Sequence, residues 1–537
     1  MVHKFISDLV TSDTIRSLSL IFLTFACLLP LTSYGATYYV SPSGSGSTCS
    51  SGSRCVLATG LGKLAGGDTL ILGDGTYSTQ IKSPAGGSAG AYTVIKAEND
   101  GSAIVQSTST ASRPLELGTS YVQIEGIKFV ANISGSTNTD AANITGSYNK
   151  IFRSAFVVTP NSDTTNNTSD VIIQGSYNLL EDCWAWGGGR YKFLLYGGND
   201  VNGGKNNILR RCVGRHDRDA STLGNGVFVN YQGASNLFQN CIVVDSDQSS
   251  YYGYWHGPFF FEKGQKGSDV WIKDSIALHY STLAVHDTSS MDYQGSMFTH
   301  GYIHISNTVA WDGGGGFETY YDYGGRLLSV DHSTFGSSNG SGGGDWSGWA
   351  FYGGGAQNSQ AVATNNILYS WAGGALGNVG GANDYNSFYA NGTNRANSTT
   401  GAHDITSINP LANSLKYLPR IETGSSLKGA GSGGSDVGAT ILYKRGTSGT
   451  LYGQSGYDTL TTEPLWPFPN EARIKADMSS YPSSWPSGNL PNPVRGFTSG
   501  TSKDGSPQTL TKYIWEYLGN QIPANIYGST PTQPRPR

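Results

Sequence analysis

NLLEDCWAW (178–186), NILRRCVGR (207–215) and NLFQNCIVV (236–244) align without gaps, and their cysteines are 29 residues apart. Related segments continue the pattern in both directions along the chain. The positions aligned with the cysteines are Ile127, Ala155, Cys183, Cys212, Cys241, Ser275, Thr308, Ser333 and Ile367. A repeat of this length is interpreted before any local feature, because it defines the structural unit of the chain.

Each repeat is short, rich in β-branched residues and interrupted by Gly or Asn, and no amphipathic helix separates one repeat from the next. Such a unit cannot fold alone, but stacked copies pair strand on strand at about 4.8 Å. The repeat therefore predicts an all-β, single-stranded parallel β-helix of about 9 to 11 coils, one coil per repeat. The aligned cysteines are expected to be small buried hydrophobes, since no CxxC spacing suggests a metal site.

The chain divides into three parts. Residues 1–35 combine basic residues, an apolar run and small residues, which is typical of an export signal and predicts a secreted, periplasmic or cell-surface protein. Residues 36–441 hold the β-helix. Residues 442–537, rich in Pro, Trp and Tyr, are expected to wrap back on the coils and to cover the open end, because an exposed last coil would template aggregation.

Composition narrows the class of partner. The net charge of −4 argues against nucleic acid, whose phosphates require a basic surface. No second apolar run is long enough to span a membrane, so the mature chain is expected to have no transmembrane span. The chain is also expected to be a monomer. Cys49 and Cys55 lie in a Gly/Ser-rich loop and are expected to form a disulfide in an oxidising compartment.

Several segments resemble the right-handed parallel β-helix proteins of the pectate-lyase-like superfamily. ATYYVSPSGSGS and GGDTLILGDGTYS (66–78) are similar to the entry segment of such proteins, and LPRIETGSSLKGAGSGGSDVGATI (418–441) is similar to their exit segment. The resemblance implies a right-handed helix and leaves the activity open, because one fold supports many chemistries. VWIKDS (270–275) resembles a pectate lyase segment, but Lys273 stands where that family has a calcium-binding Asp.

Charge is concentrated in NILRRCVGRHDRD (207–219), where seven of thirteen residues are Arg, His or Asp, although such charged residues are scarce elsewhere. Four positions after the cysteine column, successive repeats carry Gly187, His216, Asp245, His279 and Asp312. In a stack these residues are expected to be near neighbours, and an alternation of imidazole and carboxylate is electrostatically favourable. Aromatic residues crowd the same edge, which suits an extended acidic sugar chain.

These residues predict β-elimination on a uronate-containing polysaccharide, which needs a cation for the carboxylate, a base and an acid. Lys192 or Arg215 is the candidate base, and His216 or His256 is the alternative. Arg218 and Arg211 are the candidates to hold the carboxylate. The candidate substrate-binding residues are Trp184, Trp186, Tyr252, Trp255, Glu262 and His279. Calcium is a further candidate, with Asp217, Asp245 and Asp247 as ligands.

Two other functions remain open at this stage. Hydrolysis would need two carboxylates about 5 to 9.5 Å apart, which Asp217, Asp245 and Glu262 could supply, but neighbouring cations would depress the pKa of the required acid. A non-catalytic protein could instead use the aromatic edge to bind polysaccharide without cleaving it. Charge density favours a functional face, and the lyase is the first of these interpretations.

Overall fold

The computed structural model describes most of the chain after the first 34 residues. The described residues are 35–107, 112–132, 139–159, 167–198, 203–217, 225–246, 256–262, 269–287, 303–319, 328–338, 348–353, 361–412, 419–479, 497, 500–502, 505–520 and 522. Within strands, the side chains of 225, 256, 260, 262, 281–287, 318–319 and 328 lie outside the description.

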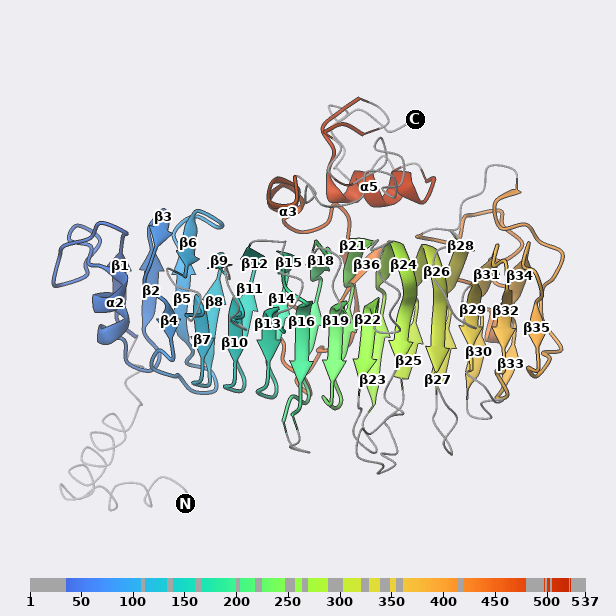
Figure 1. The fold of residues 1–537 in the computed structure, drawn as a ribbon, viewed down its shortest axis with the longest axis horizontal. Coiled ribbons are helices and arrows are strands. Elements are labelled where there is room, and N and C mark those ends of the chain that lie inside the picture. The colour runs from blue at the N-terminus through green and yellow to red at the C-terminus, as the bar shows by residue number, and fades with distance from the viewer. Residues whose placement is uncertain are drawn as a thin grey trace, which may run out of the picture.

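The chain winds into an elongated right-handed parallel β-helix, as predicted (Figure 1). A typical coil has three strands, for example β14 (Leu179–Glu181), β15 (Trp184–Gly187) and β16 (Tyr191–Tyr196). Equivalent strands of successive coils pair in parallel and build three faces, which we number in the order of these strands. Two long strands, β24 and β26, run through both face 2 and face 3.

The strands of face 1 are β1 (Thr37–Val40), β2 (Thr69–Leu72), β5 (Thr93–Ala97), β8 (Val122–Glu125), β11 (Lys150–Phe152), β14, β17 (Ile208–Arg210), β20 (Leu237–Gln239), β23 (Val270–Lys273), β25 (Ile303–Ser306), β27 (Leu328–Asp331), β30 (Val362–Thr364) and β33 (Asn383–Asp384). Those of face 2 are β3 (Gly75–Tyr77), β6 (Ala103–Gln106), β9 (Lys128–Asn132), β12 (Ala155–Thr159), β15, β18 (Val213–Gly214), β21 (Ile242–Ser246), β24 (Ile276–Asp287), β26 (Val309–Thr319), β28 (Thr334–Ser338), β31 (Ile367–Tyr369) and β34 (Ser387–Tyr389). Those of face 3 are β4 (Ile81–Lys82), β7 (Leu115–Leu117), β10 (Ala142–Ile144), β13 (Ser169–Ile173), β16, β19 (Asn225–Tyr231), β22 (His256–Glu262), the later parts of β24 and β26, β29 (Trp349–Tyr352), β32 (Gly374–Gly377) and β35 (Arg395–Ala396).

The strand register follows the aligned repeats. Leu179 pairs with Ile208, and Ile208 pairs with Leu237, as the gapless alignment predicts. The nine aligned repeats correspond to β8 through β30, and in the described chain face 1 has 13 strands, because it continues at both ends.

The alignment needs a one-residue correction in two repeats. Because Ala155 pairs with Trp184, it is Ser154 that lies beside Cys183 in the cysteine column. Because Thr334 pairs with Ile367, Asn366 occupies the column in the later repeat. The correction matters because a shift of one residue in strand register turns every side chain of the strand to the opposite side of the sheet.

The corner between face 1 and face 2 explains the polar residue before the column. In all nine repeats this residue has a positive φ, the left-handed conformation that small and polar residues tolerate best. The residues are Gly126, Arg153, Asp182, Arg211, Asn240, Asp274, Asn307, His332 and Asn365.

Inward side chains form one continuous apolar core, which includes the free thiols of Cys183, Cys212 and Cys241. Burial raises the pKa of the Cys183 and Cys241 thiols to about 12, so they remain neutral hydrophobes. Buried asparagines at the start of four successive repeats, Asn149, Asn178, Asn207 and Asn236, satisfy the backbone. The backbone amide of Asn178 donates to Asn207 Oδ1, and that of Asn207 donates to Asn236 Oδ1, both at 2.8 Å.

The N-terminal end is covered by α2 (Leu57–Lys63), whose Leu57 joins the core. The predicted disulfide between Cys49 and Cys55 is present, next to this helix. At the other end, the segment that follows β35 closes the last coil: Ile405 bridges to Ser387, and Asp404 accepts a hydrogen bond from the amide of Asn386.

The C-terminal tail lies along the flank of the solenoid. The antiparallel strands β36 (Tyr443–Arg445) and β37 (Leu460–Pro464) flank a loop, 446–459, that covers face 1, while α3 (Glu471–Asp477) and α5 (Leu510–Tyr517) cover face 2 (Figure 1). A short 3-10 helix, η2 (Ser432–Gly434), precedes them. The described part of the tail therefore wraps back on the coils, as predicted, but an apolar interface retains it over the middle coils and not over the open end.

Candidate functional site

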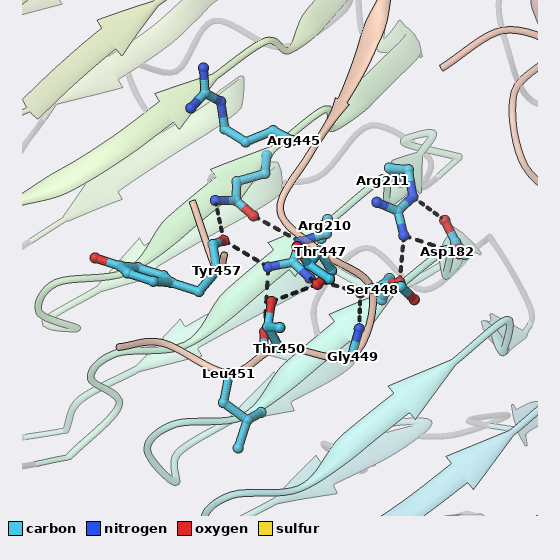
Figure 2. Close-up of polar contacts among 12 residues, drawn as sticks. Asp182, Arg210, Arg211, Arg445, Thr447, Ser448, Gly449, Thr450, Leu451 and Tyr457 are labelled. Atoms are coloured by element: carbon cyan, nitrogen blue, oxygen red, sulfur yellow. Dashed lines mark hydrogen bonds and ion pairs between the residues drawn. The ribbon is translucent and has the colours of Figure 1, made fainter. Parts of the chain in front are cut away.

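Arg210, the first of the clustered cations, points outward from β17 into the tail loop (Figure 2). Each of its five N–H groups has an acceptor at 2.8–3.4 Å: Gln239 Oε1, Glu181 Oε2 and the carbonyls of Thr447, Thr450 and Tyr457. A guanidinium with all five donors occupied has no donor left for a substrate carboxylate. Arg210 therefore holds the tail rather than a ligand.

Glu181 is the carboxylate partner of this arginine on the preceding coil. It also accepts hydrogen bonds from Arg211, from the Ser448 hydroxyl and from the amide of Gly449. Burial acts to raise the pKa of Glu181, but the guanidinium groups of Arg211 and Arg210 outweigh it and hold the pKa below its usual value. The carboxylate is therefore ionised and structural.

Arg215, a predicted catalytic base, forms a two-point ion pair with Asp217, with N–O distances of 2.6 and 2.8 Å. Its Nη1 donates to the carbonyl of Met478, just after α3, at 2.9 Å. Arg215, His216 and Asp217 are all buried. The structure thus brings these three predicted residues together, but beneath the tail, which corrects the expectation that they line an open groove.

Lys192, the other predicted base, points into the solenoid. Its Nζ lies 2.9 Å from Asp170 Oδ2, and both side chains are fully buried. The ammonium also donates to the carbonyls of Gly187 and Gly189, and Asp170 accepts from the amide of Val158, a core residue. Burial raises the pKa of Asp170 to about 7 against the opposing effect of the Lys192 ammonium. Lys192 is an internal ion-pair partner, and its predicted role as an exposed base is corrected.

Trp184 and Trp186 were expected to stack on sugar rings, but α3 covers both. Trp184 Nε1 donates to Asp477 Oδ2 at 2.8 Å, and the Arg473 guanidinium lies 4.7 Å from the indole centre. Lys128 lies 5.0 Å from the Trp186 ring and pairs with Asp477. These rings bind the tail, so the substrate-binding role predicted for them is corrected.

The column of His and Asp residues forms as predicted at one end. His279 Nδ1 lies 3.2 Å from Asp312 Oδ2 on the next coil, and the Tyr517 hydroxyl of α5 also bonds to that carboxylate. Asp245 accepts hydrogen bonds from the Phe497 amide and the Tyr513 hydroxyl. His279 is buried beside α5, so its predicted contact with substrate is corrected as well.

The carboxylates proposed as calcium ligands have protein partners. Asp217 is held by Arg215, and both oxygens of Asp245 accept from the tail. Because these oxygens already accept hydrogen bonds from the protein, the two carboxylates do not fit a calcium site as they stand. Within the described ranges, no group of three or more His, Cys, Asp or Glu residues is arranged to hold a metal.

The remaining predicted site residues lie outside the description. Arg218, Asp247, Tyr252 and Trp255 fall outside the described residues. His256 and Glu262 begin and end β22, and their side chains are not described. Their predicted roles stay predictions.

Sequence reasoning missed a second repeated signal, the tetrapeptide GSYN at 146–149 and 175–178. It forms the turn from face 3 to face 1 and contributes Tyr148 and Tyr177, which stack with ring centroids 4.8 Å apart. Sequence reasoning also missed Asp170, because the partner of an internal lysine has no local sequence signature. A search for recurring turns would have found the GSYN tetrapeptide.

By its fold, the chain is a right-handed parallel β-helix protein, which agrees with the fold that its resemblance to pectate-lyase-like proteins implies. Residues 53–243 match the family model described as Chondroitinase B, a region that contains Lys192, Arg215 and Asp217. No curated protein matches the sequence.

Solved structures similar to the chain include several lyases. A pectate lyase is 18% identical, with 76% of this chain and 96% of that chain covered and a TM-score of 0.42. An alginate lyase from Paenibacillus sp. is 13% identical, covering 68% and 99%, with a TM-score of 0.33. A family 6 polysaccharide lyase from Pseudopedobacter saltans is 14% identical, covering 63% and 84%, with a TM-score of 0.40.

Proposed function

We propose that the protein is an exported polysaccharide lyase that cleaves an acidic, uronate-containing glycan by β-elimination. The observation that carries this proposal is the match of residues 53–243 to the Chondroitinase B model on a parallel β-helix. In this reaction a cation neutralises the uronate carboxylate, a base removes the proton from the adjacent carbon, and an acid protonates the leaving oxygen.

The described cations restrict where this chemistry can take place. Lys192 and Arg215 are buried and paired with Asp170 and Asp217, so neither is available as a base in this arrangement. The proposal therefore assigns the reacting groups to Arg218 and His256, which the sequence also predicts. Calcium stays a prediction of this proposal, with Asp247 as the remaining candidate ligand.

The test is an activity screen against polygalacturonate, alginate and chondroitin-type polymers, read as ultraviolet absorbance of the new C=C bond. We expect absorbance to rise with at least one polymer, and Arg218→Ala and His256→Ala to abolish the rise. Treatment with a chelator followed by calcium addition tests the metal. If all polymers stay intact, or if reducing ends form without absorbance, the lyase proposal fails.

A second candidate, non-catalytic binding of acidic glycan, is favoured by the burial of each described side chain predicted to be catalytic. Slowed migration in gels containing a uronate polymer, without any product, would support this function instead.

A further inference from the structure

The turns that lead from face 3 into face 1 carry a row of tyrosines on successive coils. Tyr121, Tyr148 and Tyr177 stack with ring centroids 5.1 and 4.8 Å apart and planes within 6° of parallel. Tyr92 extends the row edge-on, 5.7 Å from Tyr121. All four side chains are only partly buried. We call Tyr92, Tyr121, Tyr148, Tyr177 and the neighbouring Lys150 the tyrosine edge.

Hydrogen-bond ladders hold this row at the spacing of the coils. The amide of Ser147 donates to Ser120 Oγ at 3.1 Å, and the amide of Ser176 donates to Ser147 Oγ at 3.0 Å. On the other side of the tyrosines, the amide of Asn149 donates to Asn178 Oδ1 at 2.9 Å. The rings are therefore carried by a backbone that is fixed on both sides, so the row is preorganised.

The backbone of these tyrosines is unfavourable for an aromatic residue. Tyr121, Tyr148 and Tyr177 have φ values of 58°, 60° and 57°, in the left-handed region. The next two coils have Asn206 and Ser235 at the same corner, with φ values of 58° and 53°. Asn suits this conformation better than Tyr does. Strained residues held by a rigid surrounding are a reason to look for function.

The tail loop borders one end of the row, where the Tyr452 ring lies edge-on to Tyr177 at 6.4 Å, but it bonds to none of the row's hydroxyl groups. Among the described residues, the hydroxyl groups of Tyr121, Tyr148 and Tyr177 make no hydrogen bond with the protein. The Lys150 ammonium lies 4.8 Å from the Tyr92 ring centroid and forms no ion pair with a described carboxylate. Burial lowers the pKa of Lys150, with Glu181 opposing, and the ammonium places a positive charge against the Tyr92 ring.

We propose that the tyrosine edge binds an extended acidic polysaccharide that runs parallel to the solenoid axis. Because stacked rings cover one another's faces, contact is made through hydroxyl groups, one on each coil at a spacing of about 5 Å. A pyranose unit in an extended chain advances by a similar length, so successive sugars meet successive hydroxyls. Lys150 pairs with a uronate carboxylate. This inference deepens the proposed function and rests on it for the substrate class.

The decisive variant is the triple substitution Tyr121→Phe, Tyr148→Phe and Tyr177→Phe, which removes the hydroxyls and retains the stacked rings. The matched control is Tyr369→Phe with Tyr389→Phe, a stacked pair on face 2 with centroids 6.4 Å apart. The probes are the uronate polymer that the wild type binds best and the same polymer with its carboxylates reduced to alcohols. Binding is measured by affinity electrophoresis, and cleavage by absorbance.

We expect the triple variant to raise Kd and KM at least tenfold, with kcat and the thermal unfolding midpoint unchanged and the control pair like the wild type. Lys150→Gln should weaken binding of the acidic polymer more than of its reduced form. Wild-type affinity in the triple variant, or an equal loss in the control pair, overturns the inference.

The two proposals fail in distinguishable ways. If the wild type forms unsaturated products while the triple variant keeps the wild-type KM, the proposed binding at the tyrosine edge is wrong and the lyase proposal is supported. If binding depends on the hydroxyl groups but no product forms, the lyase proposal is wrong and binding at the tyrosine edge is supported. Absence of any polymer binding by the wild type overturns the edge together with glycan recognition.

Discussion

Arg210 and Glu181 form a fully buried ion pair between adjacent coils, with Arg210 Nη1 2.9 Å from Glu181 Oε2, although both side chains point outward from face 1. Their burial comes from the tail loop, which adds three carbonyl acceptors to the arginine and two donors to the carboxylate. The pair is therefore a buried binding site for the tail loop, a segment more than 230 residues away in sequence. This explains part of the charge density in 207–219.

Removal of the arginine should leave a buried, unbalanced carboxylate. We expect Arg210→Met to lower the free energy of unfolding by about 3–5 kcal/mol, measured by urea denaturation. The combined variant with Glu181→Met should recover part of the loss, because no charge is then left unpaired. The control is Arg54→Met, which breaks a partly exposed pair with Glu98 and should cost about 0–1 kcal/mol. Equal losses of unfolding free energy in Arg210→Met and Arg54→Met would contradict this role of the Arg210–Glu181 pair.

Gly446 tests the fit of the tail loop against this arginine. Its φ is +77°, and a Cβ atom there would lie 2.4 Å from Arg210 Cζ. Gly453→Ala is the matched control, because Gly453 has a φ of +82° but nothing within 4 Å of a Cβ position. We expect both variants to lose about 1–2 kcal/mol of unfolding free energy, because alanine is disfavoured in the left-handed conformation. Only Gly446→Ala should expose the tail to limited proteolysis. Identical digestion of the two variants would show that the loop tolerates the added methyl group.

Lys192→Met separates a structural from a catalytic role. The substitution leaves Asp170 buried without its cation, so we expect a loss of several kcal/mol in unfolding free energy. We expect the variant to retain any cleavage of uronate polymer, when activity is expressed per folded molecule. Lys63→Met, at an exposed position on α2, is the stability control. Complete loss of activity in a Lys192→Met protein that is still folded would restore Lys192 as the base.

The tail should dock in a pH-dependent way through Lys475. Burial, with the Arg215 charge adding to it, lowers the pKa of Lys475 to about 8, while Asp245 opposes the shift. The unfolded chain keeps this proton up to a pH of about 10.4. Between these values the unfolded state binds more protons, so stability rises with pH. We expect this rise to be smaller in Lys475→Met, measured as the difference between the two unfolding profiles from pH 7 to 10. Parallel profiles would contradict the assignment.

Particular residues show how far the sequence alone reaches. The spacing of Cys183, Cys212 and Cys241 predicts stacked coils, and the pairing of Leu179, Ile208 and Leu237 confirms it. The alignment of two repeats was wrong by one residue, because the sequence of a short strand fits two registers about equally well unless the position of the corner residue is known. His279 and Asp312 are neighbours on successive coils, as predicted, but the burial of residues such as His279 and Arg215 was not predictable.

The sequence by itself determined the solenoid, because a repeat of near-constant length stacks chemically equivalent residues, and corners, ladders and core follow from that periodicity. Only the tertiary structure decided which polar residues are accessible. The tail has no repeat that matches the coils, so its place over Trp184, Arg215 and Arg210 follows from long-range packing and hydrogen bonds. The inward direction of Lys192 likewise depends on a partner, Asp170, that lies on another coil.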